Sequence, residues 1–101
     1  MAETEILVAH DEKAHRFEAR FPQGTAFLKY HYDPQGRLNL DHTEVPPAER
    51  HRGVAAALAK AGFDFAKERG LAVVPVCPYV IAYLKAHPEL DSLVHGDAAR
   101  K

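Results

Sequence analysis

The sequence predicts one mixed α/β (α+β) domain, with a mostly antiparallel sheet, one long helix and a short C-terminal helix. Apolar and polar residues alternate in several segments between Ile6 and Val45, as is typical of half-buried strands. The spacing of apolar residues becomes helical over residues 52–69, and residues 71–76 form a continuous apolar run. The 101 residues contain no repeat or linker, so we expect a single domain over residues 1–101.

The first half of the chain is predicted to form an antiparallel meander. A first short strand begins at residues 6–8, and further strands are predicted at residues 15–21, 25–32 and 37–45. Turn residues separate them, at 22–24 and in the Asp-Pro-Gln-Gly sequence of residues 33–36.

The second half is predicted to alternate between helix and strand. Val54, Leu58 and Phe65 recur at helical spacing, and Gly70 is a natural C-terminal cap for this helix. Residues 71–76 are typical of a buried strand that lies parallel to its neighbour after a helical crossover. Pro78 then fits the first position of a short helix over residues 78–87, which makes Cys77 its predicted N-cap.

A basic turn lies where the long helix begins. Arg50-x-x-Gly53-x-Ala55 follows a predicted strand, and its small residues let a ligand approach the backbone. Unpaired N–H groups at the positive end of a helix suit an anionic phosphate, and Arg50 and Arg52 add charge. A basic loop without a ligand has the same pattern, so the turn alone leaves both interpretations open.

Composition excludes several classes of function. The net charge of −1 provides no basic field for nucleic acid or an anionic membrane. One cysteine excludes an internal disulfide, and residues 1–5 are polar without the apolar region of a signal peptide, so we expect a cytoplasmic protein. The seven histidines include no His-x-His or His-x-x-x-His pair, so no metal site is predicted.

Several segments together carry a family resemblance. They are Arg50-x-x-Gly53-x-Ala55, His42-Thr43-Glu44-Val45-Pro46, residues 66–70, residues 73–80 and His87-Pro88-Glu89. With these segments the chain resembles the small single-domain proteins of the GNAT N-acetyltransferase superfamily that carry a cysteine after the last core strand. The resemblance covers residues 17–93 and is strongest over residues 42–88.

This resemblance implies a minimal GNAT fold that transfers an acetyl group from acetyl-CoA to an amine. It implies that the main chain of the strand end pairs with the pantetheine amides and that the following loop holds the pyrophosphate. The implied CoA-binding residues are Glu44, Val45, Arg50, His51, Arg52, Gly53, Val54, Ala55 and Ala56. In this fold the strands before and after the long helix splay apart. Pro75 therefore either marks the broken ladder or is an ordinary strand-end proline.

The catalytic candidates are Cys77 and His42. A thiol at a helix N-terminus is stabilised as thiolate, and His42 is the candidate base, with Glu44 as an alternative. The opposing interpretation makes Cys77 an inert apolar residue and His42 a cap on the core, because His42 shares strand parity with Leu38 and Leu40. Either the amine attacks the thioester directly, or Cys77 accepts the acyl group first.

Tyr79 and Tyr83 lie four residues apart on one helical face. They are candidates for the acceptor side, where Tyr79 could protonate the departing CoA thiolate, and the alternative is that both tyrosines only pack.

Two other functions stay open at this point. The chain has no segment that matches the N-terminal helices that usually enclose the acceptor site of GNAT enzymes. It could therefore be a module that binds CoA or acyl-CoA without turnover, or a small interaction domain that uses an exposed sheet edge. The sequence specifies neither the amine acceptor, which could be a small molecule, a protein or a peptide, nor the oligomeric state.

Overall fold

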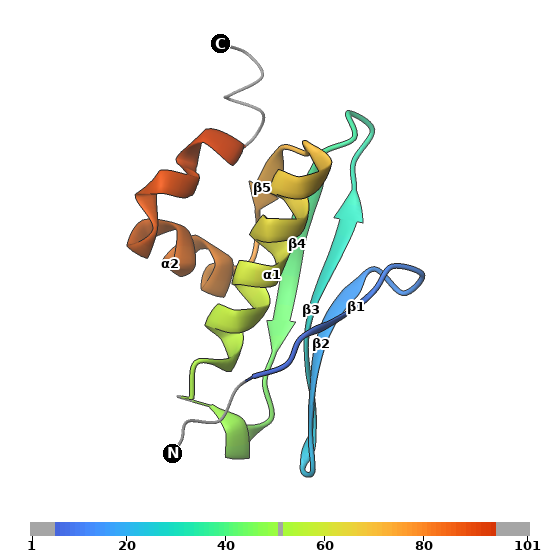
Figure 1. Cartoon of the computed structure of the whole chain (residues 1–101), viewed down its shortest axis with the longest axis vertical. Helices are drawn as coiled ribbons and strands as arrows, with labels where there is room; N and C mark the ends of the chain where they lie inside the picture. The colour runs from blue at the N-terminus through green and yellow to red at the C-terminus, as the bar shows by residue number, and fades with distance from the viewer. Residues whose placement is uncertain (1–5, 51, 95–101) are drawn as a thin grey trace.

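A computed structural model describes residues 6–50 and 52–94. Its sheet has five strands in the order of the sequence. They are β1 (Ala9–Asp11), β2 (Arg16–Phe21), β3 (Gly24–Tyr32), β4 (Leu38–Glu44) and β5 (Val73–Pro75). The pairs from β1 to β4 are antiparallel and β5 is parallel to β4, which confirms the predicted mixed, mostly antiparallel sheet (Figure 1).

The helices lie together beside one face of the sheet (Figure 1). They are α1 (Val54–Arg69), α2 (Pro78–Ala86) and the short 3-10 segments η1 (Pro47–Glu49) and η2 (Pro88–Leu93). α1 is the crossover that makes β5 parallel to β4, and it ends at Gly70 in the left-handed conformation, as predicted.

The first strand begins later than predicted. Residues 6–8 precede β1, which starts at Ala9, opposite Glu18 of β2. Ile6 and Val8 are partly buried against the core while Leu7 is exposed, so this segment packs on the core instead of pairing in the ladder.

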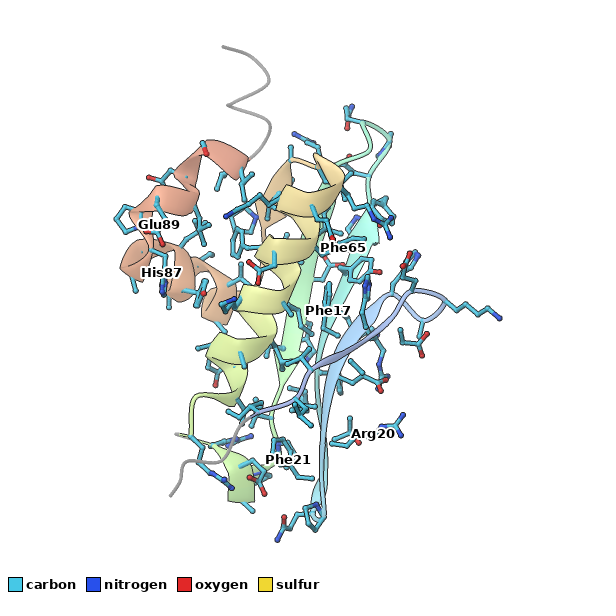
Figure 2. All side chains as sticks on the ribbon, viewed as in Figure 1. Phe17, Arg20, Phe21, Phe65, His87 and Glu89 are labelled. Atoms are coloured by element: carbon cyan, nitrogen blue, oxygen red, sulfur yellow. The ribbon has the colours of Figure 1, made fainter. Side chains whose placement is uncertain are left out.

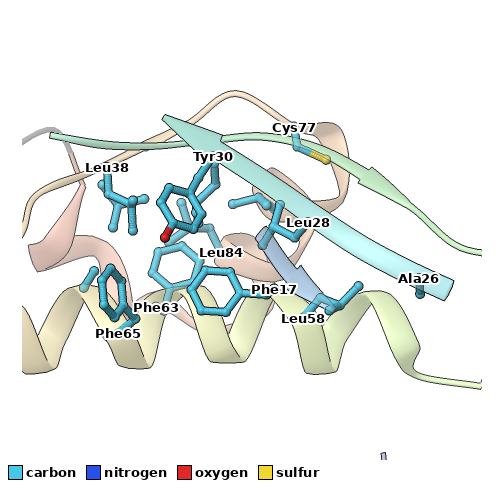
Figure 3. Close-up of a cluster of buried hydrophobic side chains, with 14 of the residues drawn as sticks. Phe17, Ala26, Leu28, Tyr30, Leu38, Leu58, Phe63, Phe65, Cys77 and Leu84 are labelled. Atoms are coloured by element: carbon cyan, nitrogen blue, oxygen red, sulfur yellow. The ribbon is translucent and has the colours of Figure 1, made fainter. Parts of the chain in front are cut away.

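The core fills the space between α1 and the sheet. Figure 3 shows Leu58 and Phe63 of α1 facing Leu28 and Leu38 of the strands. The opposite sheet face carries polar side chains, and Figure 2 shows Arg20 of β2 pointing away from α1. None of the described helices lies over that face. One face of the sheet is therefore covered by helices, and the other face is open.

A β-bulge changes the facing of β4. Lys29 of β3 is opposite His42, but the next residue, Tyr30, is opposite Leu40, so Asp41 is the additional residue. As a result, residues 38, 40, 43 and 45 are buried, whereas His42 and Glu44 are exposed. The prediction that His42 shares a face with Leu38 and Leu40 is therefore wrong, because it assumed an uninterrupted period of two.

The parallel ladder between β4 and β5 ends at Pro75. Leu40 is opposite Pro75 in the last pair, and the Leu40 carbonyl accepts hydrogen bonds from the N–H groups of Val76 and Cys77, at 3.2 and 3.0 Å. Beyond this point β4 continues to Glu44, while the segment after β5 leaves the sheet and enters α2. Pro75 is both the end of β5 and the residue at which the ladder stops, as the two sequence interpretations proposed.

Candidate active site

A pocket of about 230 Å³ lies where α1 begins. It combines the end of β4, the loop after it, the first turn of α1 and one residue of α2. The lining residues are Val45, Glu49, Arg50, Gly53, Val54, Ala55, Ala56 and Tyr79. Most residues implied to bind CoA therefore lie together. Glu44 and Arg52 are not part of this lining, and His51 lies outside the described residues.

The first turn of α1 presents free N–H groups to this pocket. Gly53 is the N-cap, with a φ of 81°, and the first hydrogen bond of the helix runs from the N–H of Ala57 to the Gly53 carbonyl, at 3.0 Å. Among the described residues no side chain caps the turn. A Cβ placed on Gly53 would have no neighbour within 4 Å in the described part of the chain, so the space beside the helix start is open there. An anion can reach them without a change in the backbone.

The two arginines of the loop are both held by other groups of the loop. The Nε of Arg50 donates to the Val45 carbonyl at 3.1 Å, while an Nη of Arg52 donates to the carboxylate of Glu49. The Glu49 side chain is only 5% exposed, although it lines the pocket. Glu49 was missed in the sequence analysis. Its only signal there is a carboxylate three residues before an arginine, a spacing that is common on protein surfaces.

Cys77 is the N-cap of α2, as predicted, but it does not line the pocket. It is 1% exposed, and its Sγ donates a hydrogen bond to the Oγ1 of Thr43 at 3.2 Å. The sequence analysis missed Thr43, because nothing in a linear pattern joins residues 34 positions apart. The thiol is therefore buried outside the pocket surface and bonded to a strand residue that is also buried.

His42 lies on the opposite face of β4 from Thr43. Its Nε2 is 2.7 Å from the Glu44 carboxylate, and their side chains are 60% and 54% exposed. The structure therefore brings His42 together with Glu44 but not with Cys77. A direct proton transfer from Cys77 to His42 has no geometric basis in this arrangement.

The two tyrosines of α2 have different surroundings. Tyr79 lines the pocket at its rim and is 54% exposed. Tyr83 stacks between the rings of Phe63 and His87, at 5.9 and 4.0 Å, and burial raises its pKa. It lines a separate cavity of about 320 Å³ together with His87 and Glu89. Figure 2 shows these two residues where α2 ends and η2 begins. Only Tyr79 is in a position to contact a ligand of the first pocket.

Two other kinds of feature are absent from residues 6–50 and 52–94. No group of three or more His, Cys, Asp or Glu side chains in this part is arranged to hold a metal ion. None of its helices is both long and apolar enough to cross a membrane.

Comparisons with known proteins identify the family of this chain. A family model described as GCN5-related N-acetyl-transferase matches residues 16–93. Protein NATD1 of Gallus gallus is 40% identical over 92 residues, which are 89% of this chain and 84% of the relative. Protein NATD1 of Homo sapiens is 40% identical over 85 residues, 82% and 75% of the two chains. Protein NATD1 of Danio rerio is 36% identical over 97 residues, 91% and 88%. The chain therefore belongs to the GCN5-related N-acetyltransferase family, a family of acyl transfer.

Proposed function

We propose that this protein transfers an acetyl group from acetyl-CoA to an amine. The observation that carries the proposal is the pocket at the start of α1, in which uncapped N–H groups of Val54, Ala55 and Ala56 face open space beside Arg50. Oriented N–H groups and a helix dipole bind a pyrophosphate without desolvating a buried charge. Arg50 adds one charge-assisted contact at the rim.

The main chain of Glu44 and Val45 is the proposed partner of the pantetheine amides. Val45 lines the same pocket as the helix start, so a ligand bound at both would run along the end of β4. The Val45 carbonyl already accepts from Arg50, but a carbonyl oxygen has two lone pairs and can accept a second hydrogen bond. From Val45 the ligand would continue towards the gap beyond the last β4–β5 pair.

The open face of the sheet is the proposed acceptor side. An amine that reaches the edge of β4 beyond its last pair with β5 from this face would meet His42, which Glu44 orients through a contact of 2.7 Å. His42 would take a proton from the amine nitrogen as this nitrogen forms the amide bond and the thioester C–S bond breaks. The Tyr79 hydroxyl, at the pocket rim, is the proposed proton donor to the departing sulfur.

Direct attack by the amine is favoured over an acyl-cysteine route. Cys77 is buried, bonded to Thr43 and separated from His42 by the strand, so it has neither access nor a base beside it. In this proposal Cys77 shapes the site and does not accept the acyl group.

A second candidate function is the binding of acyl-CoA without turnover. It is favoured by the open acceptor side, where the described residues provide no enclosing wall and His42 and Glu44 stand largely in solvent. A site that does not exclude water gains less from its electrostatic contacts with a transition state.

Mass spectrometry after incubation with acetyl-CoA tests these proposals together. Native spectra should show a non-covalent complex, and denaturing spectra should show unmodified Cys77. A panel of small amines and lysine-containing peptides then separates the two functions, because only an enzyme converts one of them. Absence of any complex at millimolar acetyl-CoA would contradict both functions, and stable acylation of Cys77 would contradict direct attack.

A further inference from the structure

The hydrogen bond between Thr43 and Cys77 closes the gap between two diverging chain segments. The parallel ladder ends at the Leu40 carbonyl, which holds the N–H groups of both Val76 and Cys77. From there β4 runs on to Glu44, while the other segment enters α2. The contact of 3.2 Å between the Cys77 Sγ and the Thr43 Oγ1 joins the two segments just beyond the point where they separate.

Both residues of this closed contact lie two positions along the chain from a residue that lines the pocket. Val45 and Tyr79 line the pocket, and Thr43 and Cys77 precede them by two residues on β4 and at the start of α2, respectively. Side chains of a strand alternate, so Thr43 shares the face of Val45 and lies one step further back along β4. Thr43 and Cys77 are 6% and 1% exposed, and neither contributes to the pocket surface. The pair is therefore next to the pocket but closed to it in this structure.

We propose that Thr43 and Cys77 determine the length of the acyl group that the protein accepts, which rests on the proposed function. An acetyl group at the inner end of the pocket would stop at this pair. A longer acyl chain would have to separate the two side chains, which costs a buried hydrogen bond and displaces well-packed neighbours. The pair therefore selects acetyl-CoA over acyl-CoA esters with longer chains.

The side chain of Thr43 allows a graded test. Thr43→Ser removes one methyl group and keeps the hydroxyl, so it should admit one further carbon. Thr43→Ala removes the methyl and the hydroxyl and should admit two. Cys77→Ala opens the gap from the other side. Thr25→Ala is the matched control, because Thr25 lies on β3 opposite Arg20 and is not part of the pocket lining.

The measurement is the ratio of dissociation constants for acetyl-, propionyl- and butyryl-CoA, obtained by calorimetry. In the natural protein each added carbon should weaken binding by about tenfold or more. Thr43→Ser should remove the penalty for propionyl-CoA, Thr43→Ala should also remove most of it for butyryl-CoA, and Thr25→Ala should leave both penalties unchanged.

The outcomes separate this inference from the proposed function. If all variants bind acetyl-CoA and no substitution at Thr43 or Cys77 changes the ratios, the length selection is wrong and the proposed function stands. Equal binding of all three esters by the natural protein would also overturn the length selection. If the folded natural protein binds none of the esters, the proposed function is overturned, and the length selection with it. Thr43→Ser retains the hydrogen bond and therefore serves if Thr43→Ala fails to fold.

Discussion

Two helices begin beside the same pocket, and they begin in opposite ways. α1 starts at Gly53 with N–H groups that no described side chain caps and with open space in front of them. α2 starts at Cys77, where Pro78 removes one N–H and the buried thiol is bonded to Thr43. Both starts have the same dipole. What differs is the access to each start, so the surroundings of a helix start decide whether it binds a ligand or seals a cavity.

Gly53→Glu should give the largest effect, because it would close the open helix start. The substitution places a carboxylate where the pyrophosphate must approach, and we expect calorimetry to detect no CoA binding. Gly36→Glu is the matched control: its φ of 77° resembles the 81° of Gly53, and both sites have open space for a Cβ, so both variants carry the same backbone strain. Unchanged affinity in Gly53→Glu, or an equal loss in Gly36→Glu, would contradict the assignment of the loop.

Arg52→Ala should weaken CoA binding by roughly 1–2 kcal/mol, partly through its effect on Glu49. Removal of the arginine leaves a buried carboxylate without its partner on the pocket surface, where it repels the ligand phosphates. The double variant Glu49→Gln with Arg52→Ala should therefore recover part of the affinity. The single variant Glu49→Gln completes the comparison. If the loss of affinity in the double variant equals the sum of the losses in the two single variants, Arg52 contacts the ligand independently of Glu49.

Alkylation of Cys77 by iodoacetamide measures how well the start of α2 is sealed. We expect a rate about tenfold or more below that of a free thiol, because reaction requires local opening, and little change on addition of CoA. Thr43→Ala should raise the rate. Fast alkylation that CoA prevents would instead support the reactive thiol that the sequence pattern suggested. A large loss of turnover in Cys77→Ser, with intact CoA affinity, would also support a reactive thiol.

The smallest effect concerns the far edge of the sheet. Burial is the main cause that lowers the pKa of His10. The charges of Arg69 and His15 lower this pKa as well, whereas those of Glu12 and Asp11 raise it. With this lowered pKa the unfolded chain binds more protons than the folded chain as the pH falls. The neutral His10 therefore stabilises the fold above about pH 6.5. This stabilisation is lost as the pH falls through the pKa of His10 in the folded state. His10→Asn should flatten the dependence of Tm on pH between 5 and 7 without changing CoA affinity. An unchanged pH dependence would show that His10 does not contribute.

Local patterns predicted the loop and both helix starts. Arg50-x-x-Gly53-x-Ala55 identified the open end of α1, and Pro78 identified Cys77 as the N-cap of α2, because proline and glycine fix the backbone of their own segments. Each of these signals depends on neighbours in the chain, and the structure confirms that a helix begins at each place.

The contents of the site were harder to predict, because they depend on contacts between distant segments. A single bulge at Asp41 reversed the assignment of His42 and turned Thr43 inward, and no residue type marks a bulge in a sequence. The partner of Cys77 is a residue of a different strand, and Glu49 is buried only because its loop folds over the pocket. The sequence therefore predicted many residues of the candidate pocket, but not the buried contacts beside it.

The bulge in β4 also has a consequence for how relatives of this protein can differ in length. Deletion of one residue near Asp41 would erase the bulge and leave the inward and outward positions of the following residues as they are. Insertion of one residue beside an intact bulge would invert them. The deletion would also keep the register, because Lys29 would remain opposite His42 and Leu28 opposite Thr43, so Thr43 would stay within reach of Cys77. In an alignment, a gap at position 41 therefore marks relatives that can lose the bulge and still keep this pair of side chains.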